Sequence, residues 1–339
     1  MSEIRLAPRL AAGDAIGIFS PSCPATAWIP ERTQLAIAYL EGHGHPVVRG
    51  SLTGKAEGYR SGGIAARAEE LNELIRDPRV KCIMASAGGF VSNSILPHID
   101  YEALRRCPKI VVGFSDVTAI LLAVYAKTGL VTFLGPNLIP VFGEVPPYAD
   151  ESYDHFRAVA FGEYRLPHAF PVPRAWTEDS VGLEEAGVAC EARANELVCV
   201  REGVAEGRLL GGNLNTLSGI FGSSYMPEIR EGDILYLEEN RGYPESIERS
   251  ISMLELSGVF RRIGGLIFGK CADYDAHGIG KSFWEVSMET LGKYAFPILA
   301  EFDCAHTRPM LTLPIGCRVR LNARMSRVEL LEDAVARRG

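Results

Sequence analysis

The sequence lacks any apolar run long enough to cross a membrane, and its start lacks the basic stretch and apolar run that mark a secretory signal. A membrane helix needs about 18 consecutive apolar residues, and a signal peptide has its own recognisable pattern. The eight cysteines form no Cys-x-x-Cys pair, which favours free thiols in a reducing compartment. We therefore expect a cytoplasmic protein that has no membrane partner.

Positive charge is also scarce. Lysine and arginine together number 35, against 42 aspartates and glutamates, and the net charge is 35 − 42 = −7 with no basic block. Binding to a nucleic-acid backbone needs such a block. The chain contains neither a Walker loop nor a Gly-x-Gly-x-x-Gly fingerprint, and Cys304 and His306 have no second pair at the spacing of a metal site. We expect no nucleic-acid partner and no metal.

The first half of the chain alternates regularly between strands and helices. Continuous apolar runs predict buried strands at 14–19, 46–48, 81–85 and 109–113, and helical patterns follow at 31–41, 65–76 and 116–127. Strands that are apolar on both faces, alternating with helices, are typical of a parallel sheet covered on both sides.

The length of 339 residues and the changes in composition along the chain predict an α/β fold of two domains. Residues 1–165 form a layered domain built on the parallel sheet. The stretch 166–205 is acidic, contains prolines and is poorly periodic, which indicates a connecting segment with a loop that reaches the site. Residues 206–339 form a smaller α/β domain with a β-rich end, because 317–321 and 327–331 alternate like a hairpin.

Ser115 lies where a buried strand ends in Gly-x-Ser and a helix begins at once. That context exposes a serine hydroxyl at the edge of a sheet, beside helix N–H groups that can receive an oxyanion. A hydrolase elbow has glycine two residues after the serine, whereas this chain has Val117 there. A serine that only caps the helix fits the same pattern, so both interpretations stay open on these residues alone.

Gly88 and Gly89 follow the strand at 81–85 and form a second candidate anion site. Two glycines let the backbone approach a substrate oxygen closely and direct an N–H at it. An ordinary turn between a strand and a helix is the alternative.

A serine nucleophile needs a base, and the base needs an orienting acid. His306 differs from the other six histidines because it directly follows a predicted strand. Glu238 and Glu239 end another predicted strand at 234–237, and strand phase makes Glu238 the first to face inward. A structural histidine and a solvated strand end are the alternatives. The order serine, acid, histidine occurs in known triads.

Six segments together resemble the LD-carboxypeptidase family of serine peptidases, and within it the microcin C self-immunity (MccF-like) group. They occur in order over roughly residues 5–332, and their combination is specific although each piece is short. The segments are Gly88–Tyr101, Gly113–Ala119, Gly211–Leu217, Ile234–Glu239, Phe302–Met310 and Pro314–Gly316.

The resemblance implies two domains with the active site at their junction. It implies that Ser115 is the nucleophile, that His306 is the general base and then the acid, and that Glu238 holds the imidazole. The backbone N–H groups of Gly89 and Asp116 would form the oxyanion hole. The family is typically homodimeric, and it needs no metal or organic cofactor.

The resemblance leaves two groups of small-molecule substrate. Muropeptide carboxypeptidases of the family have Tyr-Gly after the glycine pair, whereas this chain has Phe90-Val91, which is similar to the immunity group. Members of that group cut the amide that joins an acidic amino acid to a modified adenylate, in peptidyl- or aminoacyl-nucleotide toxins. The alternative is an LD-carboxypeptidase that releases D-alanine from cell-wall tetrapeptides.

Three residues are expected to bind the substrate, namely Gly88, Trp176 and Asn213. In the immunity group a loop tryptophan stacks on the nucleobase, and Trp176 lies in the matching loop, although packing of a long loop is an equal alternative. Asn213 follows a glycine pair, and either bonds to the substrate or caps a helix. A silent module that binds a ligand in the same cleft is the non-enzyme alternative.

Overall fold

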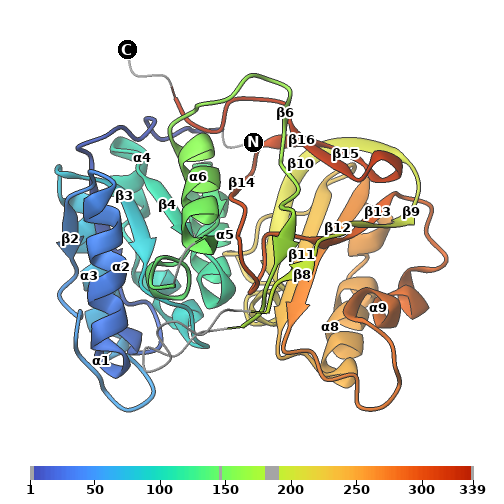
Figure 1. Cartoon of the computed structure of the whole chain (residues 1–339), viewed down its shortest axis with the longest axis horizontal. Coiled ribbons are helices and arrows are strands. Elements are labelled where there is room, and N and C mark those ends of the chain that lie inside the picture. Colours follow the sequence, from blue (N-terminus) through green and yellow to red (C-terminus); the bar gives the residue numbers. More distant parts are fainter. Residues whose placement is uncertain (1–3, 145–146, 180–190, 337–339) are drawn as a thin grey trace.

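Two β-sheets lie side by side, the blue-to-teal part of the chain on the left of Figure 1 and the yellow-to-red part on the right. The computed structural model describes residues 4–144, 147–179 and 191–336. Helices pack against both sheets. The structure therefore confirms the predicted α/β fold class.

The first sheet has the strand order β14-β5-β4-β3-β1-β2, in which β1 to β5 run parallel. Its central strands are buried along their length, as their continuous apolar runs predict. The strands are β1 (Ala15–Phe19), β2 (Val47–Arg49), β3 (Val80–Ala85), β4 (Ile110–Gly113) and β5 (Thr132–Leu134). The helices of this part are α1 (Ala25–Trp28), α2 (Pro30–Gly42), α3 (Ile64–Arg76), α4 (Tyr101–Arg106), α5 (Thr118–Thr128) and α6 (Tyr148–Ala160).

The second sheet has the strand order β6-β16-β15-β10-β11-β12-β13-β9, with a parallel centre and antiparallel edges. The parallel strands are β10 (Val204–Asn213), β11 (Ile234–Asn240), β12 (Gly265–Ala272) and β13 (Ile298–Phe302). The antiparallel strands are β6 (His168–Ala169), β9 (Val198–Arg201), β15 (Arg318–Asn322) and β16 (Arg327–Leu330). The helices are α7 (Leu214–Ser218), α8 (Pro244–Leu256) and α9 (Phe283–Leu291).

The chain crosses between the sheets a second time near its C-terminus. Strand β14 (Leu313–Ile315) pairs antiparallel with β5, with Leu313 opposite Leu134, and so joins the first sheet. The chain leaves the second sheet after β13 and returns to it in β15. The span 303–312, which carries His306, therefore connects one sheet to the other.

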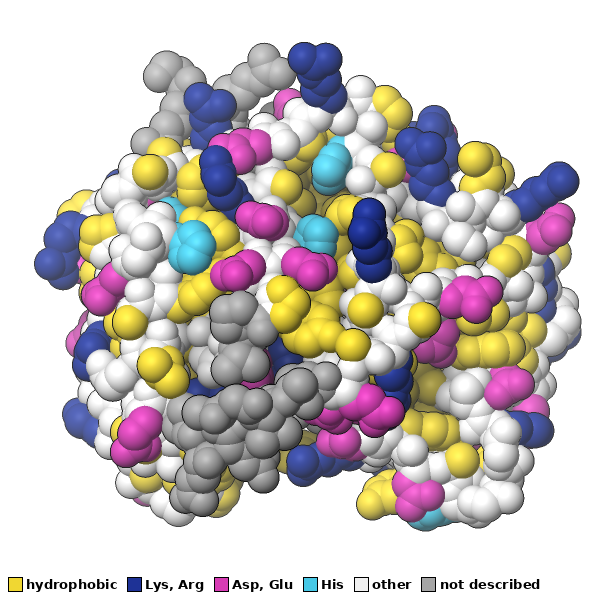
Figure 2. Space-filling view, in the orientation of Figure 1, with side chains coloured by type: hydrophobic (Ala, Val, Ile, Leu, Met, Phe, Trp, Pro, Cys, Tyr) yellow, Lys and Arg dark blue, Asp and Glu magenta, His cyan; other side chains and the backbone are white. Residues whose placement is uncertain are grey.

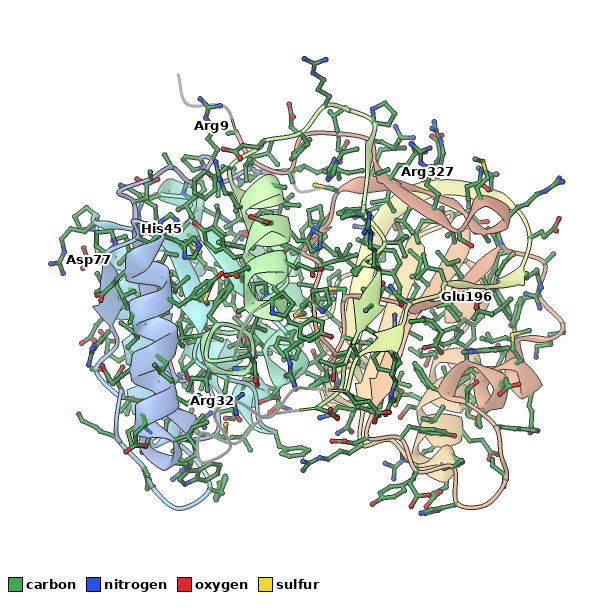
Figure 3. All side chains as sticks on the ribbon, in the orientation of Figure 1. Arg9, Arg32, His45, Asp77, Glu196 and Arg327 are labelled. Atoms are coloured by element: carbon green, nitrogen blue, oxygen red, sulfur yellow. The ribbon has the colours of Figure 1, made fainter. Side chains whose placement is uncertain are left out.

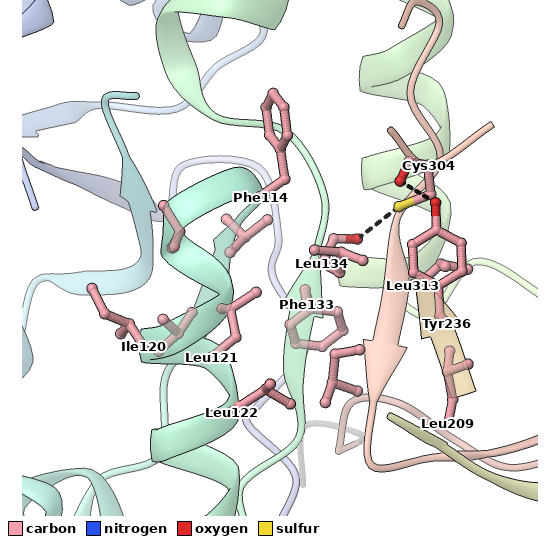
Figure 4. Close-up of a cluster of buried hydrophobic side chains, with 14 of the residues drawn as sticks. Phe114, Ile120, Leu121, Leu122, Phe133, Leu134, Leu209, Tyr236, Cys304 and Leu313 are labelled. Atoms are coloured by element: carbon pink, nitrogen blue, oxygen red, sulfur yellow. Dashed lines mark hydrogen bonds between the residues drawn. The ribbon is translucent and has the colours of Figure 1, made fainter. Parts of the chain in front are cut away.

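An apolar cluster fills the space between the two sheets (Figure 4). Phe133 and Leu134 of β5 face this cluster together with Tyr236 of β11. The Tyr236 hydroxyl donates to the Cys304 carbonyl, and the Cys304 thiol lies 3.5 Å from the Leu134 carbonyl oxygen. The two parts of the chain thus share one continuous core, which fixes their relative position.

The connecting segment contains short strands that the sequence did not predict. A small sheet pairs β7 (Ala175–Trp176) with β8 (Arg193–Ala194), and β6 and β9 belong to the same stretch of chain. Strands of two residues give no periodic signal, which is why the stretch appears irregular in the sequence. Within the described ranges, no helix is long and apolar enough to span a bilayer. Acidic and basic side chains are interspersed over the face shown in Figure 2.

Candidate active site

A cavity of about 930 Å³ opens where the parallel strands end. Arg32, at the N-terminal end of α2, lines this cavity, whereas His45 lies beyond the other end of the same helix (Figure 3). The lining includes almost all the predicted site residues: Gly88, Gly89, Ser115, Asp116, Asn213 and His306. Carboxyl ends of parallel strands are where α/β folds place their ligands.

Glu238 and His306 form a direct pair at this cavity. Glu238 lies in the C-terminal half of strand β11 with its side chain fully buried, and His306 follows β13. The Glu238 Oε2 atom lies 2.7 Å from the His306 Nδ1 atom. A buried carboxylate bonded to one ring nitrogen fixes the tautomer and directs the other nitrogen away from it. The imidazole is therefore oriented for proton transfer in the cavity.

Ser115 stands on a sharp turn between β4 and α5. Its φ is +63°, a left-handed conformation that is uncommon for a residue with a side chain. Phe114 precedes it in extended conformation, and the Phe114 ring meets the His306 ring edge to face at 4.8 Å between centroids. Strain of this kind concentrates at functional positions, and this turn has the form of a nucleophile elbow.

The glycine pair approaches the serine closely. A Cβ atom on Gly88 would lie 2.9 Å from the Ser115 Oγ atom, so a side chain there would collide with the hydroxyl. Gly89 has a φ of +145°, which side-chain-bearing residues rarely adopt. Asp116 is the next residue after the serine, in the first turn of a helical segment, where backbone N–H groups have no partner within the helix. These N–H groups have the setting of an oxyanion hole.

Asn213 serves as the N-cap of α7. Its Oδ1 atom accepts the Thr216 N–H at 3.0 Å, and its Nδ2 atom donates to the Glu239 Oε1 atom at 3.1 Å. Asn213 also lines the cavity, so the capping role and contact with a substrate are compatible. Glu239, which sequence reasoning set aside in favour of Glu238, accepts the Asn215 N–H at 2.9 Å. Burial, followed by repulsion from Glu238, raises the pKa of Glu239 to about 7.

Trp176 is placed differently from the other predicted residues. It is half-buried and is not among the described residues that line the cavity. Its ring contacts two cations, with the Lys270 Nζ atom 5.3 Å and the Arg193 guanidinium carbon 5.0 Å from the ring centroid. Residues 180–190 of the same predicted loop lie outside the described residues. Contact of Trp176 with a substrate therefore stays a prediction.

The cavity also contains residues that sequence reasoning missed. Arg241, Arg249 and Asn215 are among its lining residues, and the two arginines add positive charge. Phe90 and Tyr243, 83% and 46% exposed, give the lining exposed aromatic surface. Asn215 stands two residues after the predicted Asn213, and this spacing is the sequence feature that could have indicated Asn215 as a cavity residue. Within the described ranges, no group of three or more potential metal ligands occurs.

Two domains of one peptidase family match the chain. The LD-carboxypeptidase N-terminal domain matches residues 16–135, and the LD-carboxypeptidase C-terminal domain matches residues 206–321. This chain belongs to the LD-carboxypeptidase family. It is therefore a hydrolase of the serine peptidase class, and the resemblance inferred from the sequence is confirmed.

Relatives of the family cover nearly the whole chain. A putative carboxypeptidase of Vibrio cholerae is 49% identical over 312 residues, which are 92% of this chain and 93% of that protein. The microcin C7 self-immunity protein MccF of Escherichia coli is 43% identical over 330 residues, 97% of this chain and 96% of its own. A structure of MccF in complex with aspartyl sulfamoyl adenosine has a TM-score of 0.95 at 42% identity, and the match covers 98% of this chain and 100% of that one. MccF has also been solved with glutamyl sulfamoyl guanosine.

Proposed function

We propose that this chain is a serine hydrolase that cleaves the amide bond between an acidic aminoacyl or peptidyl group and a modified nucleotide. Such a reaction would destroy microcin C-type toxins, in self-immunity or in detoxification. The observation that carries the proposal is the 2.7 Å Glu238–His306 bond at the cavity that also holds the strained Ser115. The acidic aminoacyl nucleotides bound by the related MccF support this choice of substrate.

The first half of the reaction forms an acyl-enzyme. The Ser115 hydroxyl attacks the substrate carbonyl carbon while the free His306 nitrogen takes its proton. Glu238 stabilises the imidazolium that results, and the N–H groups of Gly89 and Asp116 bind the oxyanion. The carbonyl re-forms as the C–N bond breaks, and His306 returns the proton to the leaving nitrogen of the nucleotide part.

The second half releases the amino acid. A water molecule gives its proton to His306 and attacks the acyl-enzyme carbonyl, and the oxyanion again bonds to the two N–H groups. Collapse of this intermediate breaks the bond to Ser115 Oγ, which recovers its proton from His306. The free carboxylic acid leaves, and the resting hydroxyl and imidazole are restored.

Two arginines of the cavity lining favour an anionic acyl group. Arg241 and Arg249 are exposed cations there, and the lining also includes Asn215, Asp116 and Glu239. Guanidinium groups pair with carboxylates through two parallel hydrogen bonds. An aspartyl or glutamyl side chain is therefore the acyl group that we expect these two arginines to bind.

Mass spectrometry of two substrates tests the proposal. Wild type and Ser115→Ala are incubated with aspartyl sulfamoyl adenosine and, separately, with a cell-wall tetrapeptide. We expect wild type alone to split the adenosine compound into aspartate and sulfamoyl adenosine. Cleavage that persists in Ser115→Ala would exclude the serine mechanism.

The second candidate is an LD-carboxypeptidase that removes D-alanine from muropeptides. Membership of the LD-carboxypeptidase family and the similarity to the putative carboxypeptidase of Vibrio cholerae favour this function. Release of D-alanine alone in the same experiment would assign this function and keep Ser115 as the nucleophile. A protein that binds aspartyl sulfamoyl adenosine but cleaves neither substrate would be the non-enzyme binding module.

We further propose that the protein acts as a homodimer in the cytoplasm. The described cysteines are free thiols, three of them fully buried: Cys82, Cys304 and Cys317. Unpaired cysteines in this number are typical of proteins in a reducing compartment. Light scattering after gel filtration measures the mass of the assembly, and cell fractionation locates the protein.

A further inference from the structure

Arg67, on α3, is a buried arginine with no acidic partner among the described ion pairs. Its side chain is 1% exposed and is one of the largest fully buried side chains of the protein. Its Nε atom donates to the Gly62 carbonyl at 2.9 Å. Burial, followed by repulsion from Arg60, lowers its pKa from the usual range. Burying a charge without an opposite charge is costly, so the contacts of this guanidinium call for an explanation.

The guanidinium bridges two loops that meet beside the proposed nucleophile. Its Nη1 atom donates to the Pro21 carbonyl at 2.6 Å and to the Val91 carbonyl at 3.0 Å. Its Nη2 atom donates to the Ser94 Oγ atom at 3.0 Å. One planar group thus ties the loop after β1 to the loop after β3, and a guanidinium has the fork geometry for several acceptors at once.

Ser22 joins the same two loops from the other side. Its Oγ atom accepts the N–H groups of Phe90 and Val91, each at 3.0 Å. A Cβ on Gly89 would lie 2.3 Å from that oxygen, so the Gly89 peptide packs directly on Ser22. The two residues after Gly89 are therefore held by Ser22, and Ser22 follows Pro21, whose carbonyl Arg67 binds.

The same loop is also tied to the second proposed oxyanion donor. The Ser92 N–H donates to the Asp116 Oδ2 atom at 2.9 Å, and the Ser92 hydroxyl donates to the Asp116 carbonyl at 2.6 Å. Ser22 thus holds residues 90 and 91 of the loop, and Arg67 holds residues 91 and 94. Ser92, between them, bonds to Asp116. Any shift of the Val91 carbonyl away from Arg67 would move Gly89 relative to Asp116.

We propose that Arg67 is a positioning residue for the oxyanion hole: its guanidinium, bonded to Pro21, Val91 and Ser94, fixes the Gly89 N–H beside Ser115. The inference rests on the proposed serine mechanism. Arg67 touches no reacting atom and acts through the loop. Its role predicts a loss in the chemical step, because the oxyanion forms only after the substrate has bound.

Turnover of aspartyl sulfamoyl adenosine is measured for wild type, Arg67→Ala and Arg67→Lys. Loss of one oxyanion donor lowers turnover by about 10²–10³-fold in other hydrolases, so we expect kcat of Arg67→Ala to fall by up to about 10²-fold with KM nearly unchanged. Guanidinium chloride at tens of millimolar, but not sodium chloride, should restore part of the rate. Arg67→Lys should stay impaired, because an ammonium lacks the fork.

Arg76→Ala is the matched control, since Arg76 lies on the same helix, is half exposed and pairs with Glu69 and Asp100. It should keep the wild-type kcat. A folded Arg67→Ala with wild-type kcat would overturn the inference, and so would a loss that Arg67→Lys fully repairs. If Arg67→Ala does not fold, Ser22→Ala removes the other anchor without exposing a buried charge. A wild-type kcat in Ser22→Ala would then contradict the inference.

Two further readouts separate this inference from the proposed function. A fluorophosphonate probe that labels wild type but not Ser115→Ala identifies the nucleophile without any natural substrate. Hydrogen exchange of the backbone amides of residues 89–94 reports the loop itself. Without labelling of wild type, the serine mechanism fails, yet faster exchange in Arg67→Ala would still support the anchoring role. Exchange in Arg67→Ala that is unchanged from wild type would overturn the anchoring role of Arg67, whatever the activity of the variant.

Discussion

Glu238 and Glu239 are neighbours on β11, yet their carboxylates bind different parts of the site. Glu238 bonds to the His306 ring at 2.7 Å, whereas Glu239 accepts the Asn213 side-chain amide at 3.1 Å and the Asn215 N–H at 2.9 Å. One carboxylate therefore orients the proposed base, and the other holds the wall of the cavity in which Asn213 and Asn215 lie. The two glutamates differ in function although they are adjacent in sequence.

Replacing Glu238 with glutamine should abolish most of the turnover. The amide keeps the size of the side chain but no longer stabilises the imidazolium or selects its tautomer. The corresponding change in a serine protease lowers kcat by about 10⁴-fold, and we expect a loss of about 10³–10⁴-fold here. Steady-state kinetics of Glu238→Gln and Glu239→Gln, measured side by side, check this. A larger kcat loss in Glu239→Gln would show that the two roles are exchanged.

Glu239 should contribute a fall in the stability of the protein between about pH 4.5 and pH 7, while His155, whose pKa burial lowers to about 4, contributes in the opposite direction. The Glu239 pKa of about 7 lies above its ordinary value of 4.5, so the folded protein keeps a proton that the unfolded chain releases. The free energy of unfolding therefore decreases as pH rises through this window, by up to about 1.4 kcal/mol per pH unit for each such group. Glu70, buried and with a pKa of about 7, adds an equal share.

Urea unfolding of wild type and Glu239→Gln at several pH values tests this pH dependence. Through this window the free energy of unfolding of Glu239→Gln should change with pH less negatively than that of wild type, because only the Glu239 contribution is removed. The slope with pH is the readout, since the substitution also changes hydrogen bonds to Asn213. A decline as steep as in wild type would show that Glu239 does not titrate in this window.

Gly88→Ala should remove activity while leaving the fold intact. The new methyl group would lie 2.9 Å from the Ser115 Oγ atom, closer than such atoms approach in proteins. The hydroxyl must turn or move, and we expect kcat to fall by at least about 10²-fold, as when an oxyanion contact is lost. Gly63→Ala, whose Cβ would lie 3.8 Å from the Glu57 carboxylate, is the control. Circular dichroism confirms folding, and phosphonate labelling at the wild-type rate would contradict the prediction.

Trp176→Ala should lower the stability of the protein. The substitution removes the ring that covers the buried Lys270, which bonds to Asp303 at 2.5 Å. A cation–π contact contributes about 0.5–2 kcal/mol, and we expect the free energy of unfolding to fall by about that amount. Thermal unfolding measures it. Kinetics of Trp176→Ala with the two substrates test whether the ring also stacks on a nucleobase. Stacking predicts a higher KM for the nucleotide compound alone. An equal change in KM for both substrates would assign Trp176 to packing.

The sequence predicted the fold class because its strands are apolar and continuous. Ile110–Gly113 is buried throughout and leads directly into Ser115, so the strand-to-helix turn could be placed without a structure. Glu238 was chosen over Glu239 from strand phase, and the structure places Glu238 beside His306. The fold-class prediction is confirmed because local pattern and chain order determine it, whereas the roles of Glu238 and His306, which lie 68 residues apart in the chain, stay predictions.

Other features depend on contacts between distant parts of the chain. Strand β14 has three residues with a proline at its centre, so its pairing with β5 has no local signal. Arg67 looks like a solvent-facing residue of a polar helix, and its burial follows from loops 46 and 24 residues away. Trp176 could be assigned to a loop, but its contacts with Lys270 and Arg193 depend on two other strands.

The return of the chain through β14 has a mechanical consequence. His306 lies on a span anchored to the second sheet by β13 and to the first sheet by β14, and Ser115 follows strand β4 of that first sheet. Separating the two halves like the arms of a hinge would tear β14 from β5 and pull the imidazole from its place. We therefore expect substrate to enter and leave through the opening of the cavity, while Ser115 and His306 keep their relative position.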